Sequence, residues 1–515
     1  MRGGAENRRR RPVAESMGAA QSIDLSEIRE FSTKNRFASY RVEKHGRRAP
    51  SGAKRFGGQT MFIDASTSLE AAGRLNIAVV GTGISGLSAA WLLSQKHDVT
   101  VFEAEGRAGG HSHTVDTSSK AGPVAVDIGF IVYNETTYPN LTALFAHLGT
   151  PTKPSEMSFA VSLDGGDLEY SGSDIAGIFA QKSNVLNLRF WSMLRDIMRF
   201  YRDAPRDIGK LGLATLGQYL DQKGYGEAFR EDHLYPMAAA VWSLPAKKVA
   251  DHPAAAFVSF FQNHGLLKIV DRPLWRTVDG GARVYVEALC APFKERLRLG
   301  TPVRAIRREL GGVFIRLANG AEERFDRVVI GAHADQALAM LSDPTPEERR
   351  ILGAFRYSRN EVVLHEDAGL MPRRRKVWSS WNYTARRGDI SAPVSVTYWM
   401  NRLQTISNKT PRFVTLNPIV EPRAELTIQR QICEHPIFNA EAVAAQDQLW
   451  SLQGRRGAWF CGAYFGAGFH EDGLQAGLAV AEALGSVRRP WRVAHESGRI
   501  KLGAPARESR GALAS

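Results

Sequence analysis

A G-x-G-x-x-G motif, formed by Gly81, Gly83 and Gly86, constrains the fold of this chain more than any other feature. The apolar run at residues 77–80 predicts a buried parallel strand before the motif, and residues 84–95 predict a helix that begins inside it. In such a unit Gly81 permits the tight turn, Gly83 lets a pyrophosphate approach the backbone, and Gly86 lets the helix pack closely on the strand. The motif in this context predicts a dinucleotide-binding unit.

The helix and the strand that follows it complete the predicted unit. The first helical turn, at Ile84 and Ser85, points its free N–H groups toward the phosphates. Residues 99–102 predict a second parallel strand, which ends at Glu103. A carboxylate at this position can accept a hydrogen bond from a ribose hydroxyl and would repel a 2′-phosphate, which argues against NADP. The unit therefore predicts an α/β fold with a Rossmann-like domain, in which helices cover a parallel sheet.

The residues after the second strand favour FAD over NAD. Arg107, Gly109 and Gly110 come next in this segment, and His111 follows them directly. The segment resembles the flavin amine oxidase and phytoene desaturase superfamily, in which the glycine pair extends the contact along the FAD pyrophosphate. The resemblance implies that FAD is bound, without a covalent link. The superfamily usually carries an arginine directly after the glycines, so His111 departs from its pattern, and Arg107 is the candidate to supply the missing charge.

Two later blocks extend this resemblance. Residues 126–130 resemble the next flavin-contacting strand, with Phe130 where a second glycine is common. Residues 458–477 predict a strand, a loop and the start of a helix, and in the superfamily this helix aims its positive end at the N1–O2 edge of the flavin. The resemblance implies further cofactor contacts at Gly129, Val303, Gly462, Asp472 and Leu474.

A narrower resemblance concerns the substrate. Residues 398–404 and 468–474 look like a bacterial branch of amine-oxidase-like proteins. This branch is similar to the N-terminal part of plant cyclopropane fatty acid synthases and to flavin desaturases that act on acyl chains. The resemblance implies a FAD-dependent oxidoreductase that dehydrogenates a hydrophobic substrate, such as the acyl chain of a phospholipid, by hydride transfer to flavin N5. Two alternatives stay open: an oxidase of polyamines, and a non-catalytic flavoprotein partner of a lipid methyltransferase.

Three residues are candidates for the chemistry. His470 stands beside the predicted flavin edge, where a base with a pKa near neutrality could accept a proton, although a packing role fits equally well. Glu471 is a second candidate, with helix capping as its alternative role. Tyr398 offers a hydroxyl that could orient the substrate. We expect no metal site, because flavin dehydrogenation asks the protein mainly for orientation and exclusion of water.

The cofactor segments are far apart in the sequence, so the predicted domains are discontinuous. An α+β substrate domain is expected to be interleaved with the FAD-binding domain. The predicted parts are a disordered basic leader at 1–74, FAD-binding segments at 75–165, 266–333 and 450–486, substrate segments at 166–265 and 334–449, and a flexible basic tail at 487–515. Residues 173–264 carry a helical pattern, and the strands predicted in the second substrate segment are 361–365, 378–383, 394–399 and 413–416.

The charge of the chain is concentrated in its ends. The net charge is +14, and residues 1–74 alone hold 15 Lys and Arg against 8 Asp and Glu. Residues 486–515 hold 7 against 2, which leaves the catalytic body nearly neutral. Basic ends of this kind can attract an anionic lipid surface, although solubilising disorder explains them as well. No folded basic patch with interleaved aromatic residues predicts nucleic-acid binding.

The three cysteines are too few and too scattered for a disulfide framework or a zinc site. We therefore expect a cytoplasmic protein, with peripheral contact to the inner face of the membrane as a further option. Cys461 ends a predicted strand near the flavin, and a packing role is preferred over a covalent link to the cofactor.

Overall fold

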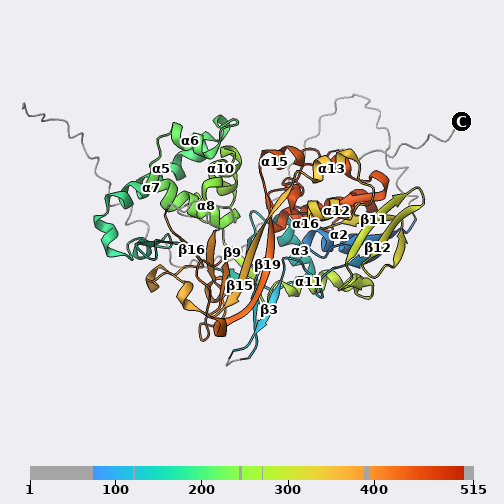
Figure 1. The fold of residues 1–515 in the computed structure, drawn as a ribbon, viewed down its shortest axis with the longest axis horizontal. Helices are drawn as coiled ribbons and strands as arrows, with labels where there is room; N and C mark the ends of the chain where they lie inside the picture. The colour runs from blue at the N-terminus through green and yellow to red at the C-terminus, as the bar shows by residue number, and fades with distance from the viewer. Residues whose placement is uncertain (1–72, 120–121, 243–245, 269–270, 388–393, 504–515) are drawn as a thin grey trace, which may run out of the picture. The chain divides into compact units, whose positions relative to one another are not determined.

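The structure is a computed structural model, and it describes residues 73–503 except 120–121, 243–245, 269–270 and 388–393 (Figure 1). These residues belong to one compact unit, Gly57–Ser515. The basic leader predicted for residues 1–74 lies outside the described residues, apart from its last two. Within the described residues, no helix is long and apolar enough to cross a membrane.

A five-stranded parallel sheet carries the predicted dinucleotide unit, with the strand order β10-β2-β1-β14-β20. Its strands are β1 (Asn76–Val80), β2 (Asp98–Phe102), β10 (Leu297–Arg298), β14 (Arg327–Ile330) and β20 (Ala458–Phe460). The middle strand β1 is apolar and buried from Ile77 onward, as expected for a parallel strand covered on both faces. The α/β class predicted from the glycine motif is confirmed.

Two helices pack against each other beside this sheet. α2 (Ile84–Leu93) follows the glycine motif and is buried along its whole length, which explains why the sequence shows no polar face. α16 (His470–Gly485) crosses it so closely that a Cβ at Gly477 would overlap the carbonyl oxygen of Ser85. Glycine at this position therefore lets the two helices touch through their backbones.

A seven-stranded sheet forms the second layer, with the order β19-β15-β18-β17-β16-β7-β8. Four of its strands are close to the predicted ones, namely β15 (Arg356–His365), β16 (Trp381–Ala385), β17 (Ser395–Trp399) and β18 (Phe413–Leu416). The others are β7 (Phe159–Leu163), β8 (Leu168–Ser171) and β19 (Thr427–Ile437). Figure 1 shows β15 and β19 as two long strands side by side, in agreement with their antiparallel pairing.

The strand β7 shows how the segments mix. It pairs in parallel with β16 in the seven-stranded sheet, although residues up to 165 were expected among the cofactor segments. The local sequence could not show this pairing, because the partner strand β16 lies more than 200 residues further along the chain. The division into two discontinuous domains itself stays a prediction.

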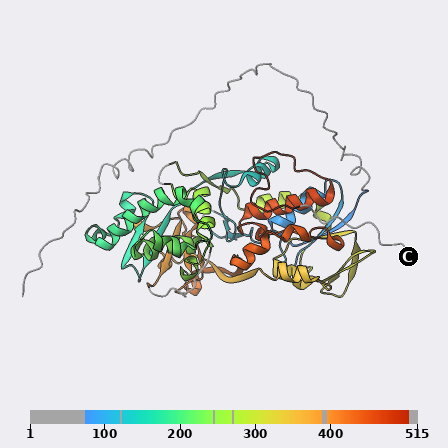
Figure 2. The same ribbon diagram turned by 90° about the horizontal axis from the view of Figure 1, so that it is seen from above.

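Helices from the first substrate segment form a separate layer, which is green in Figure 2. They are α4 (Ile175–Ile178), α5 (Leu188–Asp207), α6 (Leu216–Gln222), α7 (Glu227–Phe229), α8 (Tyr235–Trp242), α9 (Ala246–Val249) and α10 (Ala254–Asn263). In α5 the apolar stripe packs into this layer through Phe190, Met193 and Phe200, and the side chain of Asn187 accepts a hydrogen bond from the Phe190 amide at 3.3 Å. These three side chains of α5 therefore belong to the core of this layer, while its Tyr201 lines a cavity.

The remaining elements connect these layers. Small sheets are formed by β3 (Thr114–Thr117) with β4 (Val124–Asp127), by β5 (Tyr133–Asn134), β9 (Trp275–Val278) and β6 (Thr152–Ser155), and by β11 (Val303–Glu309), β12 (Gly312–Leu317) and β13 (Glu322–Phe325). The β12–β13 hairpin leads into β14 of the parallel sheet. The other helices are α3 (Pro139–Leu148), α11 (Arg283–Cys290), α12 (Ala334–Met340), α13 (Pro346–Leu352), α14 (Met400–Leu403) and α15 (Ala440–Gln446).

The segment after α16 differs from the flexible tail expected for residues 487–515. Up to Gly503 the structure describes it, and it packs against α3 and α16. The Arg489 side chain is fully buried and pairs with Glu482. Three of the basic residues that suggested a solvated tail, Arg488, Arg489 and Arg499, therefore pair with carboxylates on α16, which the local sequence cannot show.

Candidate active site

One continuous cavity of about 1670 Å³ joins the parallel sheet to the seven-stranded sheet and the helical layer. Pockets for a single small ligand usually measure roughly 300–1,000 Å³, so this cavity has room for a dinucleotide together with a substrate. We call the part lined by the turn after β1, the end of β2, residues 107–111 and Val303 the nucleotide half. The substrate half is the part lined by the aromatic side chains of Tyr138, Phe159, Tyr170, Tyr201, Trp242, Phe260, Trp275, Trp381, Tyr398 and Phe469.

The glycine motif forms a cradle at the nucleotide half. Gly81 has φ of 94°, and a Cβ there would lie 2.8 Å from the carbonyl oxygen of Gly331. Gly83 is the N-cap of α2, and a Cβ on it would meet no described atom within 4 Å, because it would project into open space. Ile84 and Ser85 line the cavity in the first turn of α2. A pyrophosphate can therefore approach this backbone and the free N–H groups of the helix.

Gly86 has a different role from the other two glycines of the motif. It does not line the cavity, and a Cβ on it would overlap the carbonyl oxygen of Gly81. It contributes to the cofactor site only through the close packing of α2 on the turn.

Glu103 lies at the carboxyl end of the parallel sheet and lines the cavity. Its Oε2 accepts hydrogen bonds from the hydroxyl of Thr82 and from the Thr82 amide at 2.9 Å, and its Oε1 accepts one from the Glu105 amide at 2.9 Å. A carboxylate offers about four lone-pair positions, so one acceptor position is left for a ribose hydroxyl. Val303, the first residue of β11, lines the same half of the cavity.

The glycine pair brings a second backbone segment against the first. Gly110 has φ of 54°, and a Cβ on it would lie 3.1 Å from the Cα of Gly83. Gly109 donates its amide to the Thr82 hydroxyl at 3.1 Å. Arg107 lines the cavity, but its Nη1 donates to the carbonyl of Gly110 at 2.8 Å and its Nη2 pairs with Glu105 at 2.9 Å. The guanidinium of Arg107 therefore stabilises the turn at the glycine pair, and the carboxylate of Glu105 compensates its positive charge.

His111 does not replace the arginine expected after the glycine pair. It lines the cavity, with its ring centroid 5.6 Å from that of His435 and 6.1 Å from that of His333. Burial lowers the pKa of His111 to about 3, so its ring is neutral at neutral pH. Gly129 lies directly behind it, where a Cβ would overlap the His111 carbonyl oxygen. Among the described residues, no group of His, Cys, Asp or Glu has the geometry to hold a metal ion.

The N-terminus of α16 faces the cavity through Phe469 and His470, and Gly462 lines the wall before it. The positive end of the helix is therefore directed at whatever the cavity holds. Asp472 and Leu474, both predicted to contact the cofactor, are buried behind this wall and do not line the cavity. The Asp472 carboxylate instead accepts a hydrogen bond from the Phe469 amide at 2.8 Å and caps the helix.

His470 is buried and neutral. Its ring stacks on Phe130 with the centroids 3.8 Å apart, and its Nε2 lies 2.8 Å from the hydroxyl of Tyr285. Burial lowers the pKa of His470 to about 3. The predicted base with a pKa near neutrality does not fit this environment, whereas a packing and hydrogen-bonding role does.

Glu471 is turned away from the cavity and belongs to the contact between α16 and α3. Its carboxylate accepts hydrogen bonds from the amides of Asn140 and Leu141, each at 3.0 Å, and from the side chains of Asn140 and Gln475. The N-cap residue of α3, Tyr138, makes no side-chain capping bond, so Glu471 supplies the cap from another helix. A catalytic role of Glu471 does not fit this position, because its oxygens are occupied in the core.

Tyr398 lines the substrate half and packs edge-on against Trp381, with the ring centroids 4.8 Å apart. Burial raises the pKa of Tyr398 above its usual value, so its hydroxyl stays protonated. This position agrees with contact to a substrate.

Several residues of the substrate half could not be predicted from the sequence. Phe260 of α10 stacks on Phe469 at 4.8 Å between ring centroids, and Tyr138 lines the cavity nearby. No local signal marks these aromatic residues, because an apolar residue of a core helix has the same pattern whether it faces the core or a cavity.

Cys461 is fully buried and does not line the cavity. Burial raises the pKa of its thiol to about 12. The packing role predicted for this cysteine agrees with its position.

Comparisons with known proteins agree with this geometry. Residues 84–363 match the family described as flavin containing amine oxidoreductase. The chain is 26% identical, over 63% of its length and 70% of the relative's, to a Mycobacterium tuberculosis protein named "Putative flavin-containing monoamine oxidase AofH".

Two solved structures share the fold. One is putrescine oxidase bound to putrescine, with a TM-score of 0.56 and 16% identity over 79% of this chain and 98% of the other. The second is a CLA-producing fatty acid isomerase from P. acnes, with a TM-score of 0.55 and 16% identity over 79% and 97% of the two chains. The open glycine cradle fits FAD, which members of the matching family use. The chain therefore belongs to the flavin containing amine oxidoreductase family and is an FAD-dependent oxidoreductase.

Proposed function

We propose that the enzyme dehydrogenates an apolar, lipid-like substrate, such as a fatty acyl chain, which occupies the substrate half of the cavity. The observation that carries this proposal is the aromatic lining of that half. The rings come from strands β7, β8, β9, β16 and β17, from helices α5, α8 and α10, and from the residues directly before α3 and α16. Such a lining gains free energy from burying methylene groups, at about 0.8 kcal/mol each.

The charges around the cavity support an uncharged reacting group. Among the described residues the carboxylates that line the cavity are Glu103, Glu105, Glu156 and Glu434. The first two lie at the nucleotide half. Glu156 pairs with Arg402 and accepts a hydrogen bond from the Ser380 hydroxyl at 2.9 Å, and Glu434 lies 3.9 Å from the guanidinium of Arg359. An ammonium group in the substrate half would find no unpaired carboxylate among them, and its desolvation would be poorly compensated.

Bound FAD supplies the hydride acceptor. The protein supplies the surroundings: aromatic side chains orient the chain and exclude water, and the N-terminus of α16 stabilises negative charge in the cavity. His470 holds its place between Phe130 and Tyr285 and keeps this wall neutral.

The second candidate function is the oxidation of an amine or polyamine. The names of the M. tuberculosis relative and of putrescine oxidase support it, and so does the stacked pair Phe260–Phe469, because two rings can frame a small amine. The lipid proposal also includes peripheral contact with a membrane through the basic residues of segment 1–74, and cooperation with a lipid methyltransferase.

Anaerobic mixing tests the two functions against each other. The flavin-loaded protein is mixed with phospholipid vesicles, with oleate, and with putrescine or spermidine, and the loss of flavin absorbance is followed. Bleaching by a lipid alone would support the acyl substrate. Bleaching by an amine alone would reverse the ranking. If none of them bleaches the flavin, the proposed substrate class is wrong, and a non-catalytic partner role gains support.

A further inference from the structure

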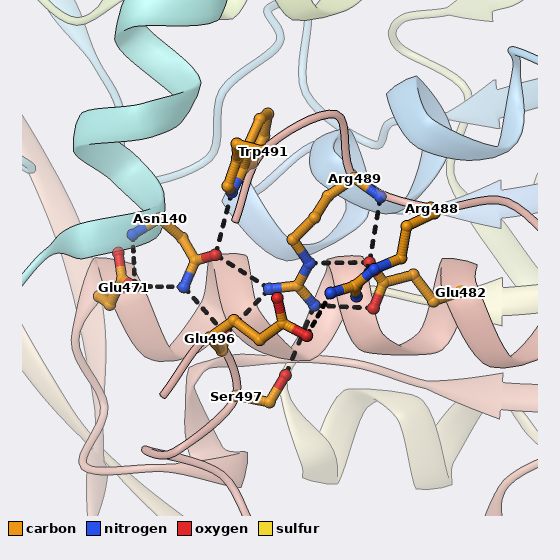
Figure 3. Close-up of polar contacts among 8 residues, drawn as sticks. All are labelled: Asn140, Glu471, Glu482, Arg488, Arg489, Trp491, Glu496 and Ser497. Atoms are coloured by element: carbon orange, nitrogen blue, oxygen red, sulfur yellow. Dashed lines mark hydrogen bonds and ion pairs between the residues drawn. The ribbon is translucent and has the colours of Figure 1, made fainter. Parts of the chain in front are cut away.

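Residues 487–501, which we call the C-terminal strap, tie α3 to α16. The Arg489 guanidinium donates to Glu482 of α16 at 2.8 and 2.9 Å and to Oδ1 of Asn140, in α3, at 2.9 Å. Trp491 donates its indole N–H to the same oxygen of Asn140 at 3.1 Å. Figure 3 shows Arg489 between the two helices, with Asn140 reaching on to Glu471. The strap is thus anchored by buried, charge-assisted hydrogen bonds.

The far end of the strap reaches the cavity wall. Arg499 donates from Nε to Oδ1 of Asp472 at 2.5 Å and from Nη1 to the Thr137 carbonyl at 2.8 Å. Its backbone amide donates to the side chain of Gln475 at 3.0 Å. Arg499 therefore joins the first turn of α16 to the residues that lead into α3.

The same guanidinium lies behind two rings of the substrate half. Its central carbon is 5.7 Å from the ring centroid of Tyr138 and 5.9 Å from that of Phe469. Both distances are within the range of a cation–π contact. Tyr138 directly precedes α3 and Phe469 directly precedes α16, so one arginine contacts both rings where their helices begin.

Arg499 also sets the charge at this helix end. Asp472 is fully buried in the first turn of α16 and forms its ion pair with Arg499. Without Arg499 the carboxylate would stand uncompensated two residues after His470, which lines the cavity. Its negative charge would oppose the positive end of the helix dipole, and the helix would stabilise negative charge in the cavity less well.

We propose that Arg499 is a positioning residue of the flavin enzyme: it neutralises Asp472 and holds Tyr138 and Phe469, so that the N-terminus of α16 keeps its positive field toward the bound flavin. The C-terminal strap therefore supports the active-site wall from behind, although it lies outside residues 84–363, which carry the family match. This role goes beyond the proposed function and needs only FAD in the cavity, whatever the substrate.

Sulfite titration of the oxidised holoenzyme tests this role without any substrate. Sulfite adds to flavin N5 without a leaving group, and the negative charge ends on the ring system, so its dissociation constant reports how well the cavity stabilises that charge. Arg499→Gln is expected to weaken sulfite binding about tenfold. The same factor in the two-electron couple lowers the flavin midpoint potential by about 30 mV.

Two further variants separate charge from packing. Asp472→Asn combined with Arg499→Gln removes both charges and keeps an oxygen that can cap α16, so sulfite affinity is expected to return to within about twofold of the parent. Arg488→Gln is the matched control, because Arg488 is on the same strap and pairs with Glu482 and Glu496 at the surface, away from the cavity. It is expected to leave sulfite affinity unchanged.

Each outcome of the sulfite titrations either supports the role of Arg499 or contradicts it. Weakening by Arg499→Gln with recovery in the double variant supports the proposal. The proposal fails if Arg499→Gln behaves like Arg488→Gln, or if the double variant is as impaired as the single one. If Arg499→Gln alone does not retain FAD, the double variant compared with the parent decides: parent-like sulfite affinity supports the role, and an impaired affinity overturns it.

Discussion

The two halves of the cavity differ in whether backbone or side chains form them. The nucleotide half is made largely of backbone, with Gly81, Gly83 and Gly110 bringing two chain segments against each other. The substrate half is made of side chains, whose rings come from strands and helices spread over more than 300 residues of sequence. A backbone cradle therefore depends on a few local conformations, whereas a side-chain chamber depends on how distant elements pack.

A methyl group added to each of two glycines of the motif separates backbone packing from cofactor binding. Gly86→Ala would place its Cβ against the carbonyl oxygen of Gly81, where backbone must move. Because overpacking typically costs about 1–3 kcal/mol even between side chains, we expect a loss of at least about 3 kcal/mol in the free energy of unfolding. Urea unfolding followed by circular dichroism measures it.

Gly83→Ala is the matched control for that variant. Its Cβ would point into open space within the cradle, so the free energy of unfolding of the apoprotein should change by less than about 1 kcal/mol. FAD affinity should fall roughly a hundredfold, or about 2.8 kcal/mol, because the methyl group occupies the space of the pyrophosphate. Equal losses of stability in both variants would contradict the separate roles of the two glycines.

Acid should destabilise the fold through His111 and His470, two buried histidines that line the cavity. Burial lowers the pKa of both His111 and His470 from 6.5 to about 3, so the unfolded chain binds more protons than the folded one below pH 6.5. The stability from these neutral rings is complete above pH 6.5 and is lost as the pH falls toward 3, at up to about 1.4 kcal/mol per pH unit for each histidine.

Urea unfolding at a series of pH values checks this slope. His470→Gln keeps a polar side chain of similar length and removes one titrating ring, so it should flatten the slope below pH 6.5. A slope identical to that of the parent would show that His470 ionises freely in the folded protein.

A substitution at Glu471 tests whether its carboxylate is structural or catalytic. Glu471→Gln would set an amide N–H against the amides of Asn140 or Leu141, and we expect the free energy of unfolding to fall by about 1–3 kcal/mol. The rate of flavin reduction at saturating substrate should stay within about fivefold of the parent, because the side chain does not line the cavity. A loss of 10²-fold or more, typical for removal of an acid–base catalyst, would restore the catalytic role.

The smallest effect is expected in the substrate half. Tyr398→Phe keeps the ring against Trp381 and removes only the hydroxyl. If this half holds its substrate mainly by apolar contact, the anaerobic rate of flavin reduction should change less than about tenfold. A larger loss in the rate at saturating substrate, with unchanged binding, would show that the hydroxyl takes part in the chemistry.

The nucleotide half could be predicted from local sequence patterns. Gly81, Gly83 and Glu103 lie in one short strand–turn–helix–strand unit, and the structure places all three around the cavity as expected. Such a motif is readable because the backbone conformations that it needs are set by neighbouring residues. The class of the fold and the strands β15, β16, β17 and β18 followed from the same kind of local pattern.

The roles of the side chains depend on the tertiary fold and could not be predicted locally. In the fold, Glu471 caps α3, Asp472 is buried behind the cavity wall, and the ring of His470 is neutral. The basic segment after α16 also forms a strap, with Arg489 buried against Glu482. The physical reason is that burial and pairing depend on residues far away in the chain, and the same side chain is a base in water and an inert ring in a core.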